Sequence, residues 1–165
     1  MNSTALSLSE LWKKIDDVKI GMFTTVDENG MLTSRPMTAR EIDADGVLWF
    51  FAALHSEVAH ELLDEPLVNV SFAEPKHGFY ASLSGHAMLI KDRALYMKLW
   101  RPLDKAWFSR GIDDPDLTLI RVEVQLAEYW DSTSSRMVQL LKTAKAAMTG
   151  ENAAEKLGKH GTLEL

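Results

Sequence analysis

The chain has 165 residues, 46% hydrophobic and 25% charged, which is typical of one globular domain with a sizeable core. Its 18 Lys and Arg against 24 Asp and Glu give a net charge of −6, which argues against binding the nucleic-acid backbone. The absence of cysteine excludes disulfides, thiolate metal ligands and cysteine nucleophiles, and it favours a cytoplasmic location. No apolar run approaches the roughly 20 residues of a membrane span, so we expect no membrane association.

The first half of the chain predicts one helix followed by three strands. Apolar residues recur at helical spacing over 7–18, and Ser7 with Glu10 forms an S-x-x-E capping box. The runs 22–26 and 31–39 alternate like strands and flank an Asn-Gly turn, which predicts a β-hairpin. The aromatic run 47–51 predicts a buried third strand, which we expect to continue a meander.

The second half predicts three further strands and three helices. The strands span 67–72, 79–90 and 117–130, and the helices span 56–64 with Ser56 as N-cap, Asp92 to Trp100, and 135–148. Six extended runs with few helices indicate a mainly β (α+β) fold whose antiparallel core closes into a small barrel. We expect residues 1–150 to form this single domain and residues 151–165 to be a mobile tail.

Common catalytic and metal-binding motifs are absent from the sequence. It lacks the Rossmann, P-loop, nucleophile-elbow and H-E-x-x-H patterns. His55 and His60 are five residues apart, a spacing that does not place both rings on one helical face, so we predict no metal site. The run 113–116 contains three Asp and one Pro but lacks the ligand spacing of a calcium-binding loop, which favours a turn.

Arg35 is the most informative single residue, because it is the one charged residue in the predicted strand 31–39. A guanidinium in a sheet needs an anionic partner, and a phosphate would satisfy it. The start of the 56–64 helix, with Ser56, offers free N–H groups that suit the same phosphate, and the aromatic run 49–51 suits a flat ring. The alternative is that Arg35 pairs with Glu41 or Asp43, that Ser56 is only a cap and that the aromatics are core.

Several segments, taken in order, resemble the FMN-binding split-barrel family related to pyridoxamine-phosphate oxidase. They are Arg35-Pro36-Met37, 48–51, 66–72, 80–87, 107–111 and 113–115, and the closing Glu128-Tyr129-Trp130-Asp131 is similar to the bacterial general-stress-protein branch. The resemblance implies a six-stranded antiparallel split β-barrel with flanking helices. It also implies a homodimer that holds FMN non-covalently at the subunit interface.

The resemblance assigns cofactor contacts to two strands. Arg35 would contact the phosphate or ribityl chain of FMN, and Pro36 and Met37 would present strand backbone to the flavin. Phe50, Phe51 and Ala52 would line the path of the isoalloxazine and ribityl groups.

The start of the 56–64 helix matches the family's S-x-K pattern only in part. Ser56 and Glu57 occupy its first two positions, but Val58 replaces the lysine. Loss of that ammonium group removes a charge-assisted contact with the phosphate and is expected to weaken FMN binding.

Three aromatic residues complete the predicted cofactor site. Tyr80 lies where related oxidases direct a polar side chain at the flavin, and Trp107 and Trp130 correspond to family positions near the cleft. Each has an alternative role, as a barrel-surface aromatic for Tyr80 and as core or dimer interface for the tryptophans. The vitamin-B6 oxidases also carry a late R-x-H element, which this chain lacks, so pyridoxamine phosphate is not the expected substrate.

Three functional interpretations follow from the resemblance. The first is an FMN-dependent oxidoreductase with a stress-related role, which takes electrons from a donor such as a nicotinamide. The second is a non-catalytic flavin carrier or sensor, and the third is the same barrel binding haem or a deazaflavin. The spacing of residues identifies no catalytic acid or base.

Overall fold

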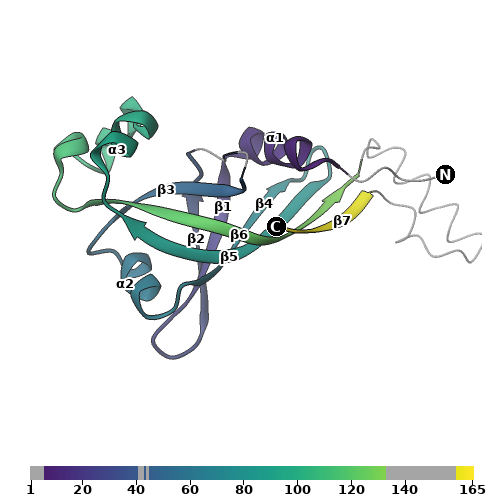
Figure 1. The fold of residues 1–165 in the computed structure, drawn as a ribbon, viewed down its shortest axis with the longest axis horizontal. Helices are drawn as coiled ribbons and strands as arrows, with labels where there is room; N and C mark the ends of the chain where they lie inside the picture. Colours follow the sequence, from purple (N-terminus) through teal and green to yellow (C-terminus); the bar gives the residue numbers. More distant parts are fainter. Residues whose placement is uncertain (1–5, 41–42, 44, 133–158) are drawn as a thin grey trace, which may run out of the picture.

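The computed structural model describes residues 6–40, 43, 45–132 and 159–165. One antiparallel sheet dominates it, with the strand order β2-β1-β4-β5-β6-β3, and β7 also pairs with β6 (Figure 1). The strands are β1 (Ile20–Val26), β2 (Leu32–Thr38), β3 (Val47–Ala53), β4 (Leu67–Glu74), β5 (Phe79–Ile90), β6 (Leu117–Asp131) and β7 (Lys159–Glu164). The helices are α1 (Leu8–Val18), α2 (Glu57–Asp64) and α3 (Arg93–Leu99), with 3-10 turns η1 (Pro102–Ala106) and η2 (Gly111–Asp113). No described helix has the length and apolar character needed to cross a bilayer.

Helix α1 begins at the capping box that the sequence predicts. The Ser7 hydroxyl accepts a hydrogen bond from Glu10 N at 3.3 Å, and the Glu10 carboxylate accepts one from Ser7 N at 2.8 Å. The helix buries Leu11, Trp12 and Ile15 against the sheet, so its apolar stripe joins the main core.

Replacing Ser7 with alanine removes this cap and leaves a helix N–H without its side-chain acceptor. We expect the free energy of unfolding to fall by about 1 kcal/mol, measured by urea denaturation. The control is Lys13→Ala, at an exposed position in the same helix, which should change stability by less than about 0.5 kcal/mol. Equal effects of the two substitutions would show that the cap contributes nothing.

The strand order corrects one prediction. β3 does not continue a meander beside β2 but pairs antiparallel with β6, with Phe50 opposite Ile120. The reason is burial: β3 is apolar on both faces, whereas every second residue of β2 is exposed. A strand that must be covered on both sides suits a place between the main core and the second cluster described below.

The sheet curls on itself without closing. Phe23 of β1 and Phe50 of β3 belong to strands far apart in the sheet, yet their ring centroids are 5.2 Å apart in an edge-to-face contact. In the described part of the chain, β2 and β3 are the two unpaired ends of the strand order, bridged nearby by Arg40 N donating to Trp49 O at 2.8 Å. The predicted antiparallel split barrel with flanking helices is therefore confirmed, with seven strands instead of six.

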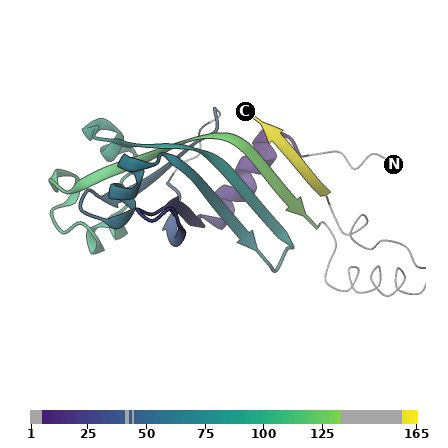
Figure 2. The same cartoon turned by 90° about the horizontal axis from the view of Figure 1, so that it is seen from below.

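The seventh strand lies in the predicted tail. β7 runs along the end of β6 and places Leu163 against the core (Figure 2). It carries Gly161 where an added Cβ would lie 2.5 Å from the Tyr129 hydroxyl oxygen. Residues 159–164 are thus ordered in a strand instead of mobile. The predicted helix over 135–148 and residues 151–158 lie outside the described residues.

A second apolar cluster covers the other end of the molecule. It is built on Phe51 and Leu119, on the face of β3 and β6 that points away from the main core, and α3, η1 and η2 cover it. Tyr96 of α3 donates a hydrogen bond to Leu117 O at 2.9 Å, and Phe108 follows η1 into the cluster. This packing fixes the loop from η1 to η2 beside the end of β3.

Candidate functional site: a cleft beside strands β2 and β3

A cleft of about 620 Å³ lies between β2, the end of β3, the start of α2 and the loop from η1 to η2. Most of the predicted cofactor-binding residues line it, and we call it the β2–β3 cleft. Those residues are Arg35, Pro36, Met37, Phe51, Ala52, Ser56, Val58 and Trp107. Its volume is in the range typical of ligand and cofactor sites. The structure thus brings together residues from four separate elements.

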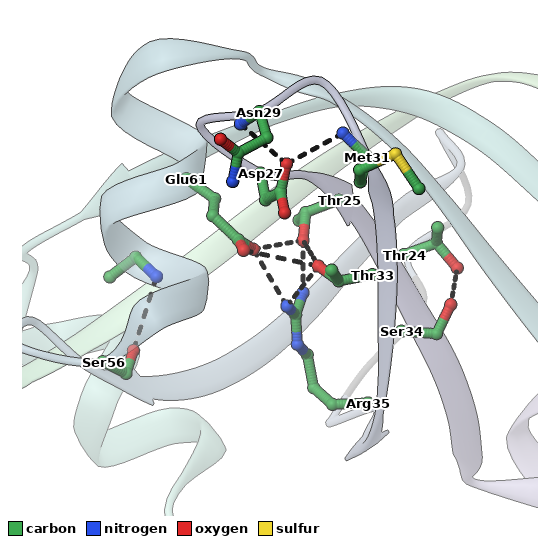
Figure 3. A network of polar contacts seen from close by, with 11 residues as sticks. Thr24, Thr25, Asp27, Asn29, Met31, Thr33, Ser34, Arg35, Ser56 and Glu61 are labelled. Carbon is green, nitrogen blue, oxygen red and sulfur yellow. Dashed lines mark hydrogen bonds and ion pairs between the residues drawn. The ribbon is translucent and has the colours of Figure 1, made fainter.

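Arg35 is held by a polar network on the inner side of the β1–β2 hairpin (Figure 3). Its Nη2 donates to Thr33 Oγ1 and to Glu61 Oε2, both at 2.9 Å, and its Nη1 donates to Thr25 Oγ1. Glu61, on α2, is 7% exposed, and Arg35 is 23% exposed. Arg35 therefore already has an anionic partner, and that partner is neither of the two nearby acids that the sequence suggested.

The network closes through the two threonines. The Thr25 hydroxyl donates to Glu61 Oε2, and the Thr33 hydroxyl donates to Oε1 at 3.3 Å. Both oxygens of the Glu61 carboxylate thereby accept hydrogen bonds from within the fold. Sequence reasoning missed Glu61, although a signal was present: it lies three residues after the buried Val58, on the apolar face of α2.

Ser56 begins α2 as predicted. Its hydroxyl donates to Ala53 O at 2.5 Å and accepts from Ala59 N at 3.4 Å, so it caps the helix. Val58 is buried and presents an apolar side chain to the β2–β3 cleft at the position of the family lysine. Glu57 is exposed and lines a neighbouring acidic pocket instead.

The apolar wall of the cleft comes from β3 and the end of η1. Phe51 and Ala52 are buried, and the Phe51 ring meets the Trp100 ring edge-on at 5.7 Å. Trp107 is 83% exposed although it belongs to an aromatic-rich segment. An exposed indole at the rim of a cleft is suited to cover a flat ligand or to contact a second molecule.

A second arginine also lines the cleft and was not predicted. Arg40 forms an ion pair with the buried Asp104, and its guanidinium carbon is 5.5 Å from the Phe51 ring centroid. Burial lowers the pKa of Arg40, the charge of Asp104 raises it and that of Arg101 lowers it again. Asp104 also accepts from Arg101 N at 2.8 Å, so the pair ties the start of η1 to the segment after β2.

Besides Glu57, three predicted residues lie away from the cleft. Phe50 is fully buried in the main core, where its ring packs edge-on against Phe23, and it does not line the cleft. Tyr80 and Trp130 are cross-strand neighbours on β5 and β6. They line an apolar groove of about 300 Å³ on the outer face of the sheet, with Ile20 and Met22 among the other lining residues. We call this the outer groove.

The histidines show no metal-binding arrangement. The His55 ring contacts the Asp116 carboxylate, which also accepts from His55 N at 3.1 Å. This contact fixes the turn that the sequence predicted over 113–116 against the start of α2. Within the described ranges there is no group of three or more His, Asp or Glu residues suited to hold a metal ion.

Comparison with known proteins identifies the family. The profile of the pyridoxamine 5'-phosphate oxidase like family matches residues 7–154. Protein bli-3 of Neurospora crassa is 32% identical over 145 residues, which cover 82% of this chain and 69% of that protein. The general stress FMN/FAD binding protein of Xanthomonas citri has a TM-score of 0.65 at 32% identity, covering 76% of this chain and 88% of that one. A candidate general stress protein 26 from Jannaschia sp. CCS1 has a TM-score of 0.73 at 26% identity, covering 93% and 95%. The chain therefore belongs to the pyridoxamine 5'-phosphate oxidase like family.

Proposed function

We propose that this protein binds FMN in the β2–β3 cleft and acts as a flavin-dependent oxidoreductase. The observation that carries the proposal is the cleft itself, which joins Arg35 and the start of α2 to an aromatic wall. The residues fit the cofactor, since a phosphate suits the polar end and an isoalloxazine ring suits the apolar wall. The family and the flavin-binding relative in Xanthomonas citri support the same ligand.

The protein's own groups would position the cofactor and exclude water from it. Phe51 and Ala52 line the cleft as buried residues, and Trp107 lines it with an exposed indole. Bound FMN would supply hydride-accepting chemistry, while the chain supplies orientation and a low-dielectric surrounding. The proposal includes the stress-related role named for the relatives and a cytoplasmic location.

The proposal also includes a homodimer in which two copies complete each site. The predicted residues lie on two separate surfaces of one chain, the β2–β3 cleft and the outer groove. Ile20, Met22, Tyr80 and Trp130 leave apolar surface exposed around the outer groove. Contact between this groove and the partner's cleft would cover both surfaces and would place Trp130 of the partner subunit near the flavin.

The test is a titration of the purified protein with FMN, followed by flavin fluorescence, together with the molar mass by light scattering. We expect saturable binding, a dimeric mass and reduction of the bound flavin by NADH or NADPH under anaerobic conditions. Binding without reduction would favour a flavin carrier. Absence of binding, or a haem-type absorbance in the purified protein, would contradict the proposal.

Trp107→Ala tests the aromatic rim. Loss of the indole should weaken FMN binding about tenfold, because a ring contact contributes roughly 0.5 to 1.5 kcal/mol beyond its buried area. The matched control is Leu103→Ala, an exposed apolar residue of η1 that does not line the cleft. The control should bind FMN like the wild type. A Trp107→Ala protein with unchanged affinity would place the flavin elsewhere.

A further inference from the structure

Charge compensation is the unusual feature of the β2–β3 cleft. Arg35 and Arg40 both line it, and each is paired with a buried carboxylate, from Glu61 and Asp104 respectively. Asp114 and Asp116 add further carboxylates to the lining. A phosphate entering this cleft would therefore meet arginines whose charges are already offset.

Glu61 is the residue that controls Arg35. Its carboxylate receives hydrogen bonds from the guanidinium, from Thr25 and from Thr33, so it is fixed in place, and its side chain is only 7% exposed. It also belongs to the helix that Ser56 caps. One side chain thus both offsets the charge of Arg35 and joins β2 to the helix start.

We propose that Glu61 is a specificity-determining residue of the flavin site. By offsetting the charge of Arg35, it limits what the phosphate adds to binding, so the site discriminates only weakly between FMN and riboflavin. This inference rests on the proposed function, because Glu61 acts on the same ligand class through Arg35, which lines the cleft.

The physical argument is electrostatic. The phosphate of FMN is the only charged group that riboflavin lacks, and an unopposed arginine would favour it by a charge-assisted hydrogen bond. A carboxylate within hydrogen-bond distance of that arginine repels the same phosphate, and the low exposure of Glu61 reduces solvent screening of the repulsion. Val58 contributes no compensating charge at the helix start.

Glu61→Gln isolates the charge from the geometry. Its amide oxygen can still accept from Arg35, and its shape is that of the carboxylate. FMN affinity should rise about three- to tenfold, the effect of removing one nearby negative charge at intermediate dielectric, and riboflavin affinity should stay unchanged. The matched control is Asp64→Asn, which makes the same charge change at an exposed position of α2 and should alter neither affinity. A purely structural role of Glu61 would change both affinities together.

The wild-type protein provides a second measurement that needs no variant. Its affinities for FMN and riboflavin, from fluorescence titration, should differ by less than about tenfold, and the FMN affinity should depend only weakly on salt. A preference for FMN above about a hundredfold, or an FMN affinity that Glu61→Gln lowers or leaves unchanged, would overturn the inference alone. Failure of the wild type to bind either flavin would overturn the proposed function and this inference with it.

Discussion

Gly85→Ala is expected to lower the free energy of unfolding by more than about 3 kcal/mol, because the added atom overlaps backbone that cannot move aside. A Cβ at Gly85 would lie 2.0 Å from Glu123 O and 3.0 Å from Val124 Cα. The approach is this close because the β5–β6 register shifts between Ser84 and Gly85. Urea denaturation followed by circular dichroism measures the loss.

This register shift is a β-bulge at which β6 changes its pairing partner, so disrupting it should be strongly destabilising. Before it, β6 pairs with β3 as far as Glu123; after it, β6 pairs with β7 from Leu126 onward. Gln125 falls between the two registers and its carbonyl accepts from Leu165 N at 2.9 Å. The strand therefore changes its edge partner at the point where Gly85 allows the backbones to approach.

Gly30→Ala is the matched control for this prediction. Gly30 has a φ of +76° in the β1–β2 turn, but an added Cβ there meets nothing within 4 Å. Only the left-handed backbone conformation opposes the alanine, so the loss should be about 1 kcal/mol. Equal losses at the two glycines would show that the contact with Glu123 is relieved easily.

Local patterns in the sequence predict most elements of the fold but not all of their partners. The capping box at Ser7 and the Asn-Gly turn at Gly30 fix element ends through contacts a few residues apart, and both are confirmed. The pairing of β3 with β6 was not predicted, since an apolar run records burial but not which strand lies beside it. β7 was missed because a short strand with Gly161 inside it carries little alternation.

The candidate site, like the fold, could be predicted from the sequence only in part. Arg35 could be placed at the cleft because it is charged within a strand, and Phe51 because it belongs to the aromatic run 49–51 and matches the family pattern. Glu61 is 26 residues from Arg35, and the network between them forms only when α2 packs under the hairpin. Phe50 was assigned to the cleft by resemblance, but its ring packs against Phe23 in the main core, a contact between distant strands that the local sequence does not reveal.

Arg35→Ala is expected to lower the free energy of unfolding by about 3 kcal/mol, because it leaves the buried Glu61 carboxylate without its cation. The 23% exposure of Arg35 keeps the effect at the lower end for buried pairs, since some water reaches the guanidinium. Urea denaturation of both single variants and of the double Arg35→Ala, Glu61→Ala variant gives the coupling energy, which should be about 2 kcal/mol.

The exposed pair Arg93 and Asp113 is the control for that cycle. Its side chains are 60% and 70% exposed with a nitrogen-to-oxygen distance of 2.9 Å, so solvent should reduce its coupling energy below about 0.5 kcal/mol. Additive losses at Arg35 and Glu61 would mean that the network contributes geometry alone. If Arg35 and Glu61 are coupled and the control pair is not, the fold itself requires a cation at this point of β2. The presence of an arginine there is then explained without any bound phosphate. Flavin affinity of the stable double variant then measures what Arg35 adds to binding, separately from what it adds to folding.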